Sequence, residues 1–357
     1  MDPQQILKAS AFMLLMIIGI PGNLFILVQF TYIRLKERKL LSNNKILTVL
    51  SFNNFLIIIA RVIPQTLDAI AVENLLDDTE CKLVLYTYRV NRAMSIGVTS
   101  LLSCHQCILI APMTGMWVYL KQKVSKNPII IILVFWIMNL STYPVFVMNA
   151  HAKKNISTAY ALHVIYCDAE FLNQISYIAN GVFYTVRDLI FVTLMIVASS
   201  YIVFTLFNHE KSMRKIKGLN NPQRRSAKDK ASRAVFLLVA LYVLLFGLDN
   251  SLWIYTLTLP KVETEINDIR IFVACCYAAL SPILVITTNP KLQISFLYLY
   301  KQRPFQNISS SDENVYCITT QQSNGHFSTA LQMVFDDGIR SENECSKRNI
   351  IAKTSAR

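Results

Sequence analysis

Three polar side chains inside one long apolar segment form the group in this sequence best suited to hold a small molecule. Tyr88, Arg89 and Arg92 lie within residues 80–112, where a charged group is costly to bury unless it is paired. Residues 88 and 92 are one helical turn apart and therefore share a face of a helix. A guanidinium next to a phenol on that face can grip an anionic or carbonyl-bearing ligand.

Two acidic side chains offer an alternative partner for this arginine. An internal ion pair of Arg92 with Asp188 or Asp249 carries the same weight as ligand binding, and the two are compatible because a ligand can compete for the pair. Arg187 and Asp188 are interpreted first as a structural pair, or as an arginine that extends toward the membrane surface beside a buried acid. Asp249 is the one acid of its apolar segment and is the better partner. The candidate ligand-binding residues are therefore Tyr88, Arg89, Arg92, Arg187 and Asp249.

Patterns typical of enzymes are absent from the sequence. It contains no zinc-ligand spacing, no glycine-rich phosphate loop and no nucleophile motif. His105, His151 and His163 are scattered, and nothing groups them into a metal site. We expect no catalytic residue, no metal and no cofactor.

Seven long apolar segments must position these residues. We predict them near residues 9–32, 46–72, 80–112, 128–150, 177–208, 233–258 and 268–289. Each is long enough to cross a hydrocarbon layer of ~30 Å as a helix, and helices are required because lipid offers the backbone no hydrogen-bond partner. Only 16% of the 357 residues are charged and 53% are hydrophobic. The sequence predicts an all-α membrane protein, a seven-transmembrane helix bundle over 9–299, with a short extracellular N-terminus (1–8) and a disordered cytosolic tail (300–357).

The basic residues gather in the connecting segments on one side of this bundle. Residues 209–232 alone hold eight, among them Arg214, Lys215 and Lys230, whereas the opposite connections are acidic or sparse in charge. Since basic loops stay in the cytosol, the N-terminus is predicted outside and the C-terminus inside. This topology also accounts for the net charge of +13, because the basic residues flank the membrane spans. Their attraction to anionic membrane lipid is a secondary benefit, and nucleic-acid binding is not expected.

Two cysteines differ from the other six in being predicted on the outer side. A disulfide between Cys81 and Cys167 would hold the loop between the fourth and fifth spans over the mouth of the bundle; two unrelated free thiols are the alternative. Asn155 begins an N-I-S sequon in the same loop and is the candidate glycosylation site.

Polar and helix-bending residues inside the spans are interpreted as structural. Asn23 and Asn54 are predicted to form hydrogen bonds across helices, each worth about 1 kcal/mol. Pro64, Pro144 and Pro282 are predicted to kink spans two, four and seven.

A set of short motifs recurs in order along the spans. They are Gly22-Asn23, Ile63-Pro64-Gln65-Thr66, Cys81-Lys82-Leu83-Val84, Arg89-Val90 with Arg92, Leu101-Leu102-Ser103 with Gln106 and Pro112, Arg187-Asp188, and Asn250-Ser251. With the predicted topology, they resemble rhodopsin-like G-protein-coupled receptors and, more closely, the vomeronasal type 1 pheromone receptors. The resemblance covers roughly residues 20–290.

Some residues depart from these patterns. The inner end of the third span reads His105-Gln106-Cys107, where most rhodopsin-like receptors have an acidic-Arg-aromatic triplet, and this resembles the vomeronasal pattern. The tail after about residue 300 is long for the family, which leaves room for a divergent or ancestral-type member.

The resemblance implies a function and its partners. A small volatile or steroid-like ligand would bind in the outer half of the bundle, and a heterotrimeric G protein of the inhibitory type would bind at its inner end. The residues implied in coupling are His105, Gln106, Arg214, Lys215 and Lys230. The protein would lie in the plasma membrane of vomeronasal or olfactory sensory neurons, and a hetero-oligomer with another receptor is compatible with this interpretation.

Two other classes compete with a chemosensory receptor. A non-sensing partner that aids the assembly or trafficking of other chemosensory receptors is kept open by the altered triplet and the long tail. A channel or carrier is less favoured because the chain shows no internal repeat.

Overall fold

The computed structural model describes the chain over residues 3–38, 40–70, 76–111, 115–123, 128–144, 150–152, 161–164, 167–170, 174–215, 222–258 and 264–302. Its helices are α1 (Pro3–Glu37), α2 (Ser42–Ile57), the π-helical turn η1 (Ile58–Val62), α3 (Ile63–Ala69), α4 (Asp78–Ile110), α5 (Met116–Lys123), α6 (Pro128–Thr142), α8 (Gln174–Lys215), α9 (Pro222–Thr258), α10 (Thr264–Thr288) and α11 (Pro290–Gln302). Its strands are β1 (Ala150–Ala152), β2 (Ala161–Val164) and β3 (Cys167–Glu170).

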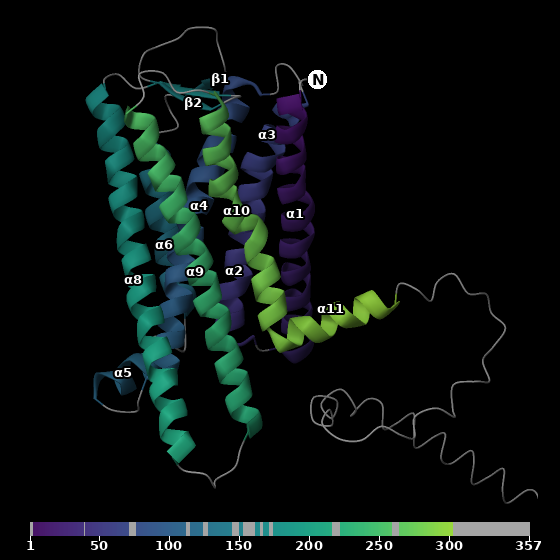
Figure 1. The fold of residues 1–357 in the computed structure, drawn as a ribbon, viewed down its shortest axis with the longest axis vertical. Helices are drawn as coiled ribbons and strands as arrows, with labels where there is room; N and C mark the ends of the chain where they lie inside the picture. Colours follow the sequence, from purple (N-terminus) through teal and green to yellow (C-terminus); the bar gives the residue numbers. More distant parts are fainter. Residues whose placement is uncertain are drawn as a thin grey trace, which may run out of the picture. The chain divides into compact units, whose positions relative to one another are not determined.

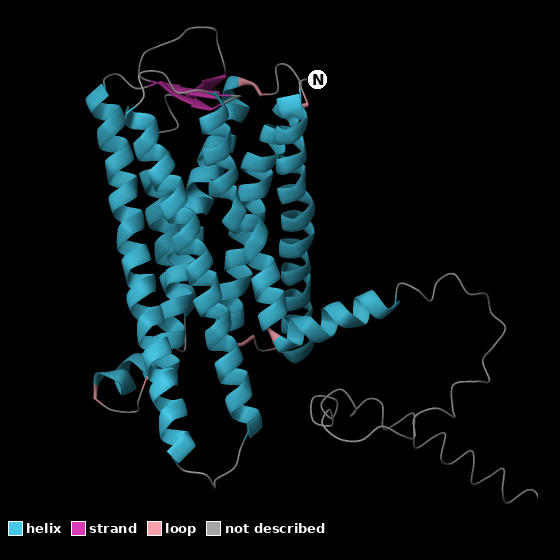
Figure 2. Cartoon of the chain, viewed as in Figure 1, coloured by secondary structure: helices cyan, strands magenta, loops and turns pink. Residues whose placement is uncertain are grey.

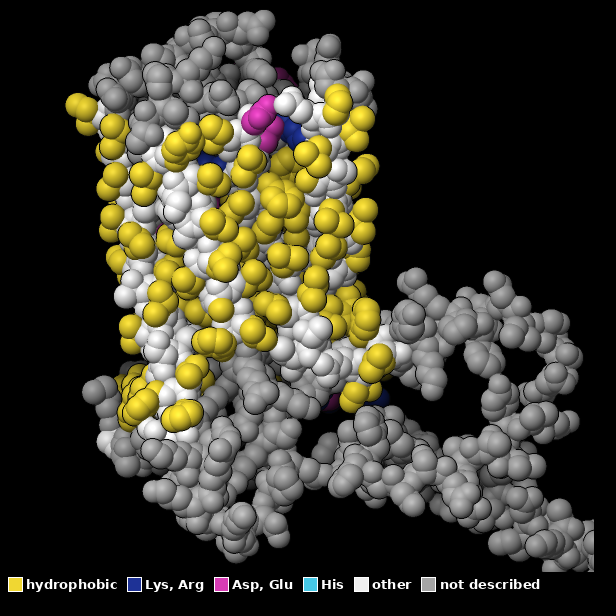
Figure 3. Space-filling model, viewed as in Figure 1, with side chains coloured by type: hydrophobic (Ala, Val, Ile, Leu, Met, Phe, Trp, Pro, Cys, Tyr) yellow, Lys and Arg dark blue, Asp and Glu magenta, His cyan; other side chains and the backbone are white. Residues whose placement is uncertain are grey.

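The long helices run side by side in a bundle, with the small sheet at the end where the chain begins (Figures 1 and 2). Six helical segments in the described part of the chain are long and apolar enough to cross a membrane: α1, the continuous α2-η1-α3, α4, and parts of α8, α9 and α10. Hydrophobic side chains cover the middle of the face seen in Figure 3, and charged ones lie near its ends. The predicted helical membrane bundle is confirmed.

The fourth predicted span, 128–150, is interrupted at Tyr143, and its last residue lies in a strand and not in a helix. Helix α6 ends at Thr142, and residue 150 begins β1. Pro144 disfavours helical geometry in the residue before it, which accounts for the interruption at Tyr143; Pro144 itself is again helical, and residues 145–149 lie outside the described residues. The 15 residues of α6 span about 22 Å, short of a hydrocarbon layer of ~30 Å. The seventh crossing therefore stays a prediction.

Span two bends where Pro64 was predicted to act. The five residues of η1 form a π-helical turn directly before α3. Because proline has no N–H, the carbonyl one turn earlier loses its helical partner, and a wider turn accommodates the mismatch. The extra residue in this turn rotates the helix face, which brings Arg61 to the bundle interior with 7% of its surface exposed.

Buried amides join the helices as predicted. Asn23 of α1 donates from Nδ2 to the Ala278 carbonyl of α10, at 3.0 Å. Asn54 of α2 donates to Ser281 Oγ at 2.8 Å and accepts from Ser95 Oγ at 2.7 Å. A polar seam therefore fixes α1, α2, α4 and α10 against one another.

Small residues permit the close contact of α1 with α10. A Cβ at Gly19 would lie 2.3 Å from Ile58 Cδ1 and 3.1 Å from Ala279 Cα. Any larger side chain would push these helices apart and stretch the Asn23 hydrogen bond. Pro282 lies within α10, where it was predicted to bend span seven.

Several helices extend beyond the predicted spans. Helix α1 begins at Pro3, α8 continues to Lys215, and α9 begins at Pro222. The helix α11 was not predicted at all; it starts at Pro290 and is amphipathic. Leu292 on α11 is fully buried, and Phe296 packs edge-on against Phe25 of α1 with ring centroids 5.7 Å apart.

Candidate functional site

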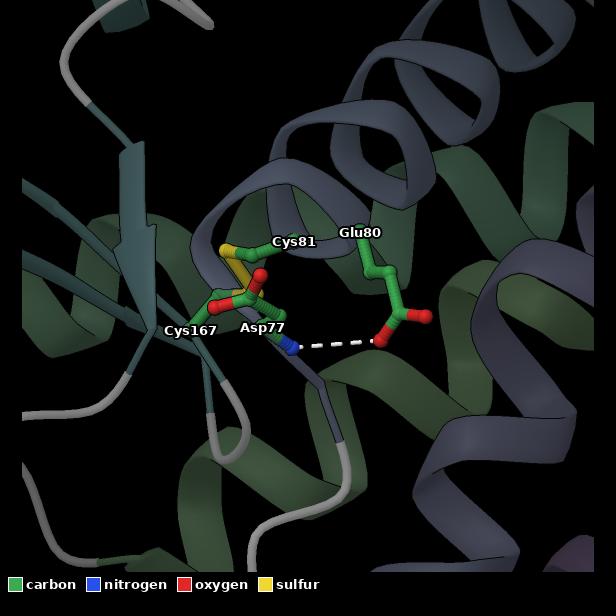
Figure 4. Close-up of a disulfide and its surroundings, with 4 residues drawn as sticks. All are labelled: Asp77, Glu80, Cys81 and Cys167. Carbon is green, nitrogen blue, oxygen red and sulfur yellow. Dashed lines mark hydrogen bonds between the residues drawn. A yellow bond between two sulfur atoms is a disulfide. The ribbon is translucent and has the colours of Figure 1, made fainter.

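The outer end of α4 is tied to the sheet by a disulfide. Cys81 lies in the first turn of α4 and Cys167 begins β3, the central strand in the order β1-β3-β2. The Asp77 backbone N–H donates to Glu80 Oε2 at 3.2 Å and fixes the start of α4 beside the bond (Figure 4). The structure thus contains the disulfide predicted from the sequence. Asn155, the predicted glycosylation residue, lies outside the described residues.

A small cavity opens between α4, η1, α9 and α10. Its volume is about 40 Å³. It is lined by Arg61, Leu85, Tyr88, Arg89, Arg92, Asp249, Asn267, Arg270, Ile271 and Ala274. Arg92 follows Cys81 by eleven residues, so the cavity floor lies roughly 16 Å along α4 from the disulfide. This places the cavity in the half of the bundle that carries the disulfide and the sheet.

An ion pair between α4 and α9 forms the floor of this cavity. Arg92 Nη2 contacts Asp249 Oδ2 at 2.5 Å, and Arg92 Nη1 donates to Tyr88 Oη at 3.1 Å. Arg270 Nε of α10 lies 3.7 Å from Asp249 Oδ1. One carboxylate therefore serves two guanidinium groups, and of the two partners considered for Arg92 the structure selects Asp249.

The cavity carries excess positive charge. Four arginines line it, at 61, 89, 92 and 270, and Asp249 is the one acid among the described lining residues. Four positive charges and one negative charge leave +3. Guanidinium groups stay protonated and present planar donor pairs suited to a carboxylate, sulfate or phosphate. The electrostatics of the cavity favour an anion.

Two of these arginines were not among the predicted site residues. The Arg61 guanidinium stacks over the Tyr88 ring at 5.0 Å, and Arg270 approaches Asp249 from α10. A basic residue in the middle of an apolar span was a signal in the sequence for Arg61. Arg270 follows two acids at the start of the last span, where it resembles an ordinary interfacial charge.

A second cavity lies directly beyond the ion pair. Its volume is about 30 Å³, and apolar residues such as Ile57, Leu245 and Phe246 dominate its lining. Arg92, Asp249 and Ala274 line both cavities. The ion pair therefore lies at the boundary between a polar chamber near the disulfide and an apolar chamber deeper in the bundle.

Arg187 does not line either cavity, although it was predicted to bind the ligand. It donates from Nε and Nη2 to Asp188 Oδ1, at 3.0 and 2.6 Å, and from Nη1 to the Tyr143 hydroxyl. Its guanidinium lies 5.5 Å from the Tyr143 ring centre and 5.4 Å from that of Tyr184, and these rings stack on each other. Arg187 points from α8 toward the end of α6 and away from the two cavities, so it links these two helices. Its role as a structural pair with Asp188 was the first interpretation.

Arg89 connects the two arginine clusters. It lines the polar cavity, and its guanidinium also lies 5.8 Å from the Tyr184 ring centre. Arg89 on α4 therefore contacts both the polar cavity and Tyr184 of α8.

The predicted coupling residues divide into two groups. His105 and Gln106 of α4 are 2% and 5% exposed, and Gln106 donates to Asn43 Oδ1 at 2.9 Å. Both therefore face the bundle interior in this conformation. Arg214, Lys215 and Lys230 lie near the facing ends of α8 and α9, and their side chains are outside the described part of the structure.

Comparison with known proteins identifies related chains. The model of the vomeronasal organ pheromone receptor family matches residues 7–297. Olfactory receptor class A-like protein 1 of Danio rerio is 35% identical over 297 residues, which cover 82% of this chain and 92% of that protein. Vomeronasal type-1 receptor 3 of Homo sapiens is 27% identical over 277 residues, 77% of this chain and 88% of that protein. Vomeronasal type-1 receptor 4 of Homo sapiens is 26% identical over 287 residues, 80% and 95% of the two chains.

Proposed function

The chain belongs to the vomeronasal organ pheromone receptor family, and we propose that it is a chemosensory receptor for a small organic anion that signals through a G protein. The family is one of multi-pass G-protein-coupled receptors, and the long apolar helices agree with it. The observation that carries the ligand class is the convergence of four arginines and one acid on one cavity.

The proposed mechanism begins with the ion pair. A cavity of about 40 Å³ is far below the 300–1,000 Å³ typical of small-molecule sites, so a ligand has to create its own space. An anionic group that takes the place of the Asp249 carboxylate on Arg92 would open the boundary between the polar and the apolar chamber. The remaining hydrophobic part of the ligand would then occupy the apolar chamber. A volatile carboxylic acid and a conjugated steroid both fit this description.

Opening the pair also supplies the conformational change. Arg92 joins α4 to α9, and its loss would release α9 to move relative to α4. A ligand shifts this equilibrium only as far as it prefers the open state. With the N-terminus outside, as the basic connections favour, movement of α8 and α9 at their inner ends would expose His105 and Gln106 together with Arg214, Lys215 and Lys230 to an inhibitory-type G protein.

The first test removes the cation at the boundary. Arg92→Ala is expected to abolish the response to a panel of small aromatic and aliphatic carboxylic acids while surface expression is retained. The readout is a G-protein activation assay in transfected cells, with the methyl ester of each acid as an uncharged control. An unchanged response of Arg92→Ala to an active acid would overturn the proposed site.

A second variant separates ligand binding from simple loss of structure. Asp249→Asn removes the competing carboxylate but keeps all four arginines, so it is expected to respond to lower concentrations of the same acids. Tyr143→Phe is the control for stability, because it weakens the Arg187 cluster by about 1 kcal/mol and Tyr143 lines neither cavity. If esters activate as well as acids, the anionic ligand class is wrong even if the receptor function holds.

A non-sensing partner of other chemosensory receptors is the second candidate, and the small volume of the cavity favours it. Expression mapped cell by cell in the sensory epithelium distinguishes the two. Expression in a sparse, mutually exclusive set of vomeronasal or olfactory neurons is expected for a dedicated receptor. Expression in every receptor-bearing neuron would favour a partner within hetero-oligomers.

A further inference from the structure

A large groove lies at the opposite end of the bundle from the disulfide. It runs between the last turns of α1, the start of α2 and the first half of α6, and Lys291 of α11 reaches it. Its volume is about 1,020 Å³, many times that of the cavity around Arg92. The amphipathic helix α11 and the α1–α2 connection lie at this end of the bundle, so the groove reaches the level at which the helices leave the membrane.

The part of the groove toward the bundle centre is apolar. Phe30 and Ile132 form its floor and are 0% and 4% exposed, and Trp136 of α6 lies beside them, partly buried. Leu133 on the rim is 54% exposed. An open apolar groove on the side of a membrane helix bundle faces acyl chains and not water.

The part of the groove toward the membrane surface is strongly basic. Arg34, Arg38, Lys45 and Lys291 line it together with the single acid Glu37, so the described lining residues carry a charge of +4 − 1 = +3. Glu37 is engaged by Lys291 Nζ at 2.8 Å, which leaves the positive charge of the other three uncompensated by an ion pair among the described residues. Arg38 takes a positive φ of 53° where α1 ends, a backbone conformation that a side chain other than glycine seldom adopts.

We propose that this groove binds one anionic glycerophospholipid, with its phosphate and headgroup on Arg34, Arg38 and Lys45 and an acyl chain along Phe30 and Trp136. The order of the two surfaces matches the lipid: charge lies at the membrane boundary, and the apolar lining continues toward the bundle centre. Basic pockets between membrane helices bind anionic headgroups through charge and through the planar donor pairs of arginine.

The positive charge of the groove favours an anionic phospholipid over a sterol or a zwitterionic phospholipid. A sterol carries one neutral hydroxyl, which gives no reason for three excess cations at the rim. A zwitterionic phospholipid offers a phosphate but also brings a cation of its own. A lipid with net negative charge compensates the rim, and the cytosolic leaflet, which the basic connections of this chain are predicted to face, is the leaflet rich in such lipids.

Trp136 provides a direct probe of occupancy. The chain has three tryptophans, and replacement of Trp117 and Trp253 by phenylalanine leaves Trp136 as the one emitter. The full-length variant is placed in phosphatidylcholine bilayers that contain either phosphatidylserine or phosphatidylcholine brominated on the acyl chain, at equal low mole fraction. Bromine quenches a nearby indole, so preferential binding of the anionic lipid appears as stronger quenching by brominated phosphatidylserine.

The charge variants are made in this single-tryptophan chain. Arg34→Gln and Lys45→Gln are each expected to lower the preference for phosphatidylserine about tenfold, since each removes a charge-assisted hydrogen bond to the lipid phosphate. Lys36→Gln is the matched control: it removes one positive charge from the same end of α1, but Lys36 does not line the groove. Its preference is expected to stay that of the parent chain.

Three results would overturn the proposal. Equal quenching by the two brominated lipids would mean that the groove does not select anionic lipid. An effect of Lys36→Gln as large as that of Lys45→Gln would reduce the preference to general surface attraction. Relief of quenching by added cholesterol, but not by unbrominated phosphatidylserine, would assign the groove to a sterol. Thermal unfolding of each variant confirms that the fold is intact, and a variant that fails it is replaced by Arg38→Gln.

Discussion

Two arginine–aspartate pairs lie in the half of the bundle that carries the disulfide, and they differ in their position along the chain and in their surroundings. Arg92 and Asp249 are 157 residues apart and join α4 to α9, whereas Arg187 and Asp188 are neighbours on α8. Both aspartates have 10% of the side-chain surface exposed. The contrast teaches that burial of an ion pair does not by itself indicate its role; the surroundings of the pair do.

The surroundings of the two pairs suggest opposite roles. The Arg187 guanidinium lies against the stacked rings of Tyr143 and Tyr184, so a ligand would have no space beside it. Arg92 borders two cavities and shares its carboxylate with Arg270. Arg187 therefore links α8 to Tyr143 through contacts that leave no room for a ligand, whereas the Arg92–Asp249 pair borders empty space, as the proposed opening requires.

Loss of the Cys81–Cys167 disulfide is expected to have the strongest effect of the substitutions considered, and it affects both ion pairs alike. Both clusters contact α4, whose outer end the disulfide holds. Cys167→Ser opens a link between residues 86 apart, worth up to about 4–5 kcal/mol by chain entropy. The variant is expected to be retained inside the cell, as measured by surface labelling. Cys104→Ser, which removes a thiol outside the disulfide, is expected to reach the surface. Normal surface display of Cys167→Ser with unaltered gel mobility without reductant would contradict this link.

Removal of each aspartate charge is expected to lower the free energy of unfolding by different amounts. Asp188→Asn leaves Arg187 without its anion among aromatic rings and is expected to cost about 3–5 kcal/mol. Asp249→Asn is expected to cost only about 1–2 kcal/mol, since Arg92 keeps the Tyr88 hydroxyl and faces a cavity that water can enter. Thermal unfolding of the purified variants measures the difference. Equal destabilisation by the two substitutions would remove the distinction between a fixed and an opening pair.

Replacement of each arginine by lysine keeps the charge and tests whether the planar shape of the guanidinium matters. Arg187 uses three nitrogens and its flat face, which an ammonium group does not reproduce, so Arg187→Lys is expected to lower stability by about 1–2 kcal/mol. Arg92→Lys keeps the charge at the cavity and is expected to leave stability nearly unchanged while it weakens the response to carboxylic acids about tenfold. Dose–response curves and unfolding curves of both variants test this. A stability loss confined to Arg92→Lys would reverse the assignment.

The smallest expected effect concerns the two hydroxyls that accept from these arginines. Tyr88→Phe removes the acceptor of Arg92 Nη1 and is expected to weaken the response about fivefold, equivalent to about 1 kcal/mol. Tyr143→Phe removes the acceptor of Arg187 Nη1 and is expected to lower stability by a similar energy with no change in ligand sensitivity. A change in sensitivity for Tyr143→Phe alone would place the ligand beside Arg187.

Much of this molecule could be predicted from its sequence. The apolar segments, the disulfide cysteines, the buried amides of Asn23 and Asn54 and the group Tyr88–Arg92 follow from local composition and spacing. They are predictable because lipid constrains each crossing separately: a span must be apolar and helical, and a polar group inside it must find a partner. The resemblance of short motifs then pointed to the family to which the chain belongs.

Other features depend on how the helices rotate and pack. Arg92 had two possible acids, and only the positions of α8 and α9 around α4 decided for Asp249. Arg61 lies within the π-helical turn, whose wider winding changes the direction of its side chain relative to a regular helix, and it lines the cavity. The helix α11 and the basic groove at the other end of the bundle also depend on tertiary packing. The physical reason is common to all: spacing along a span fixes which residues share a face, and the direction in which that face points is fixed only by its neighbours.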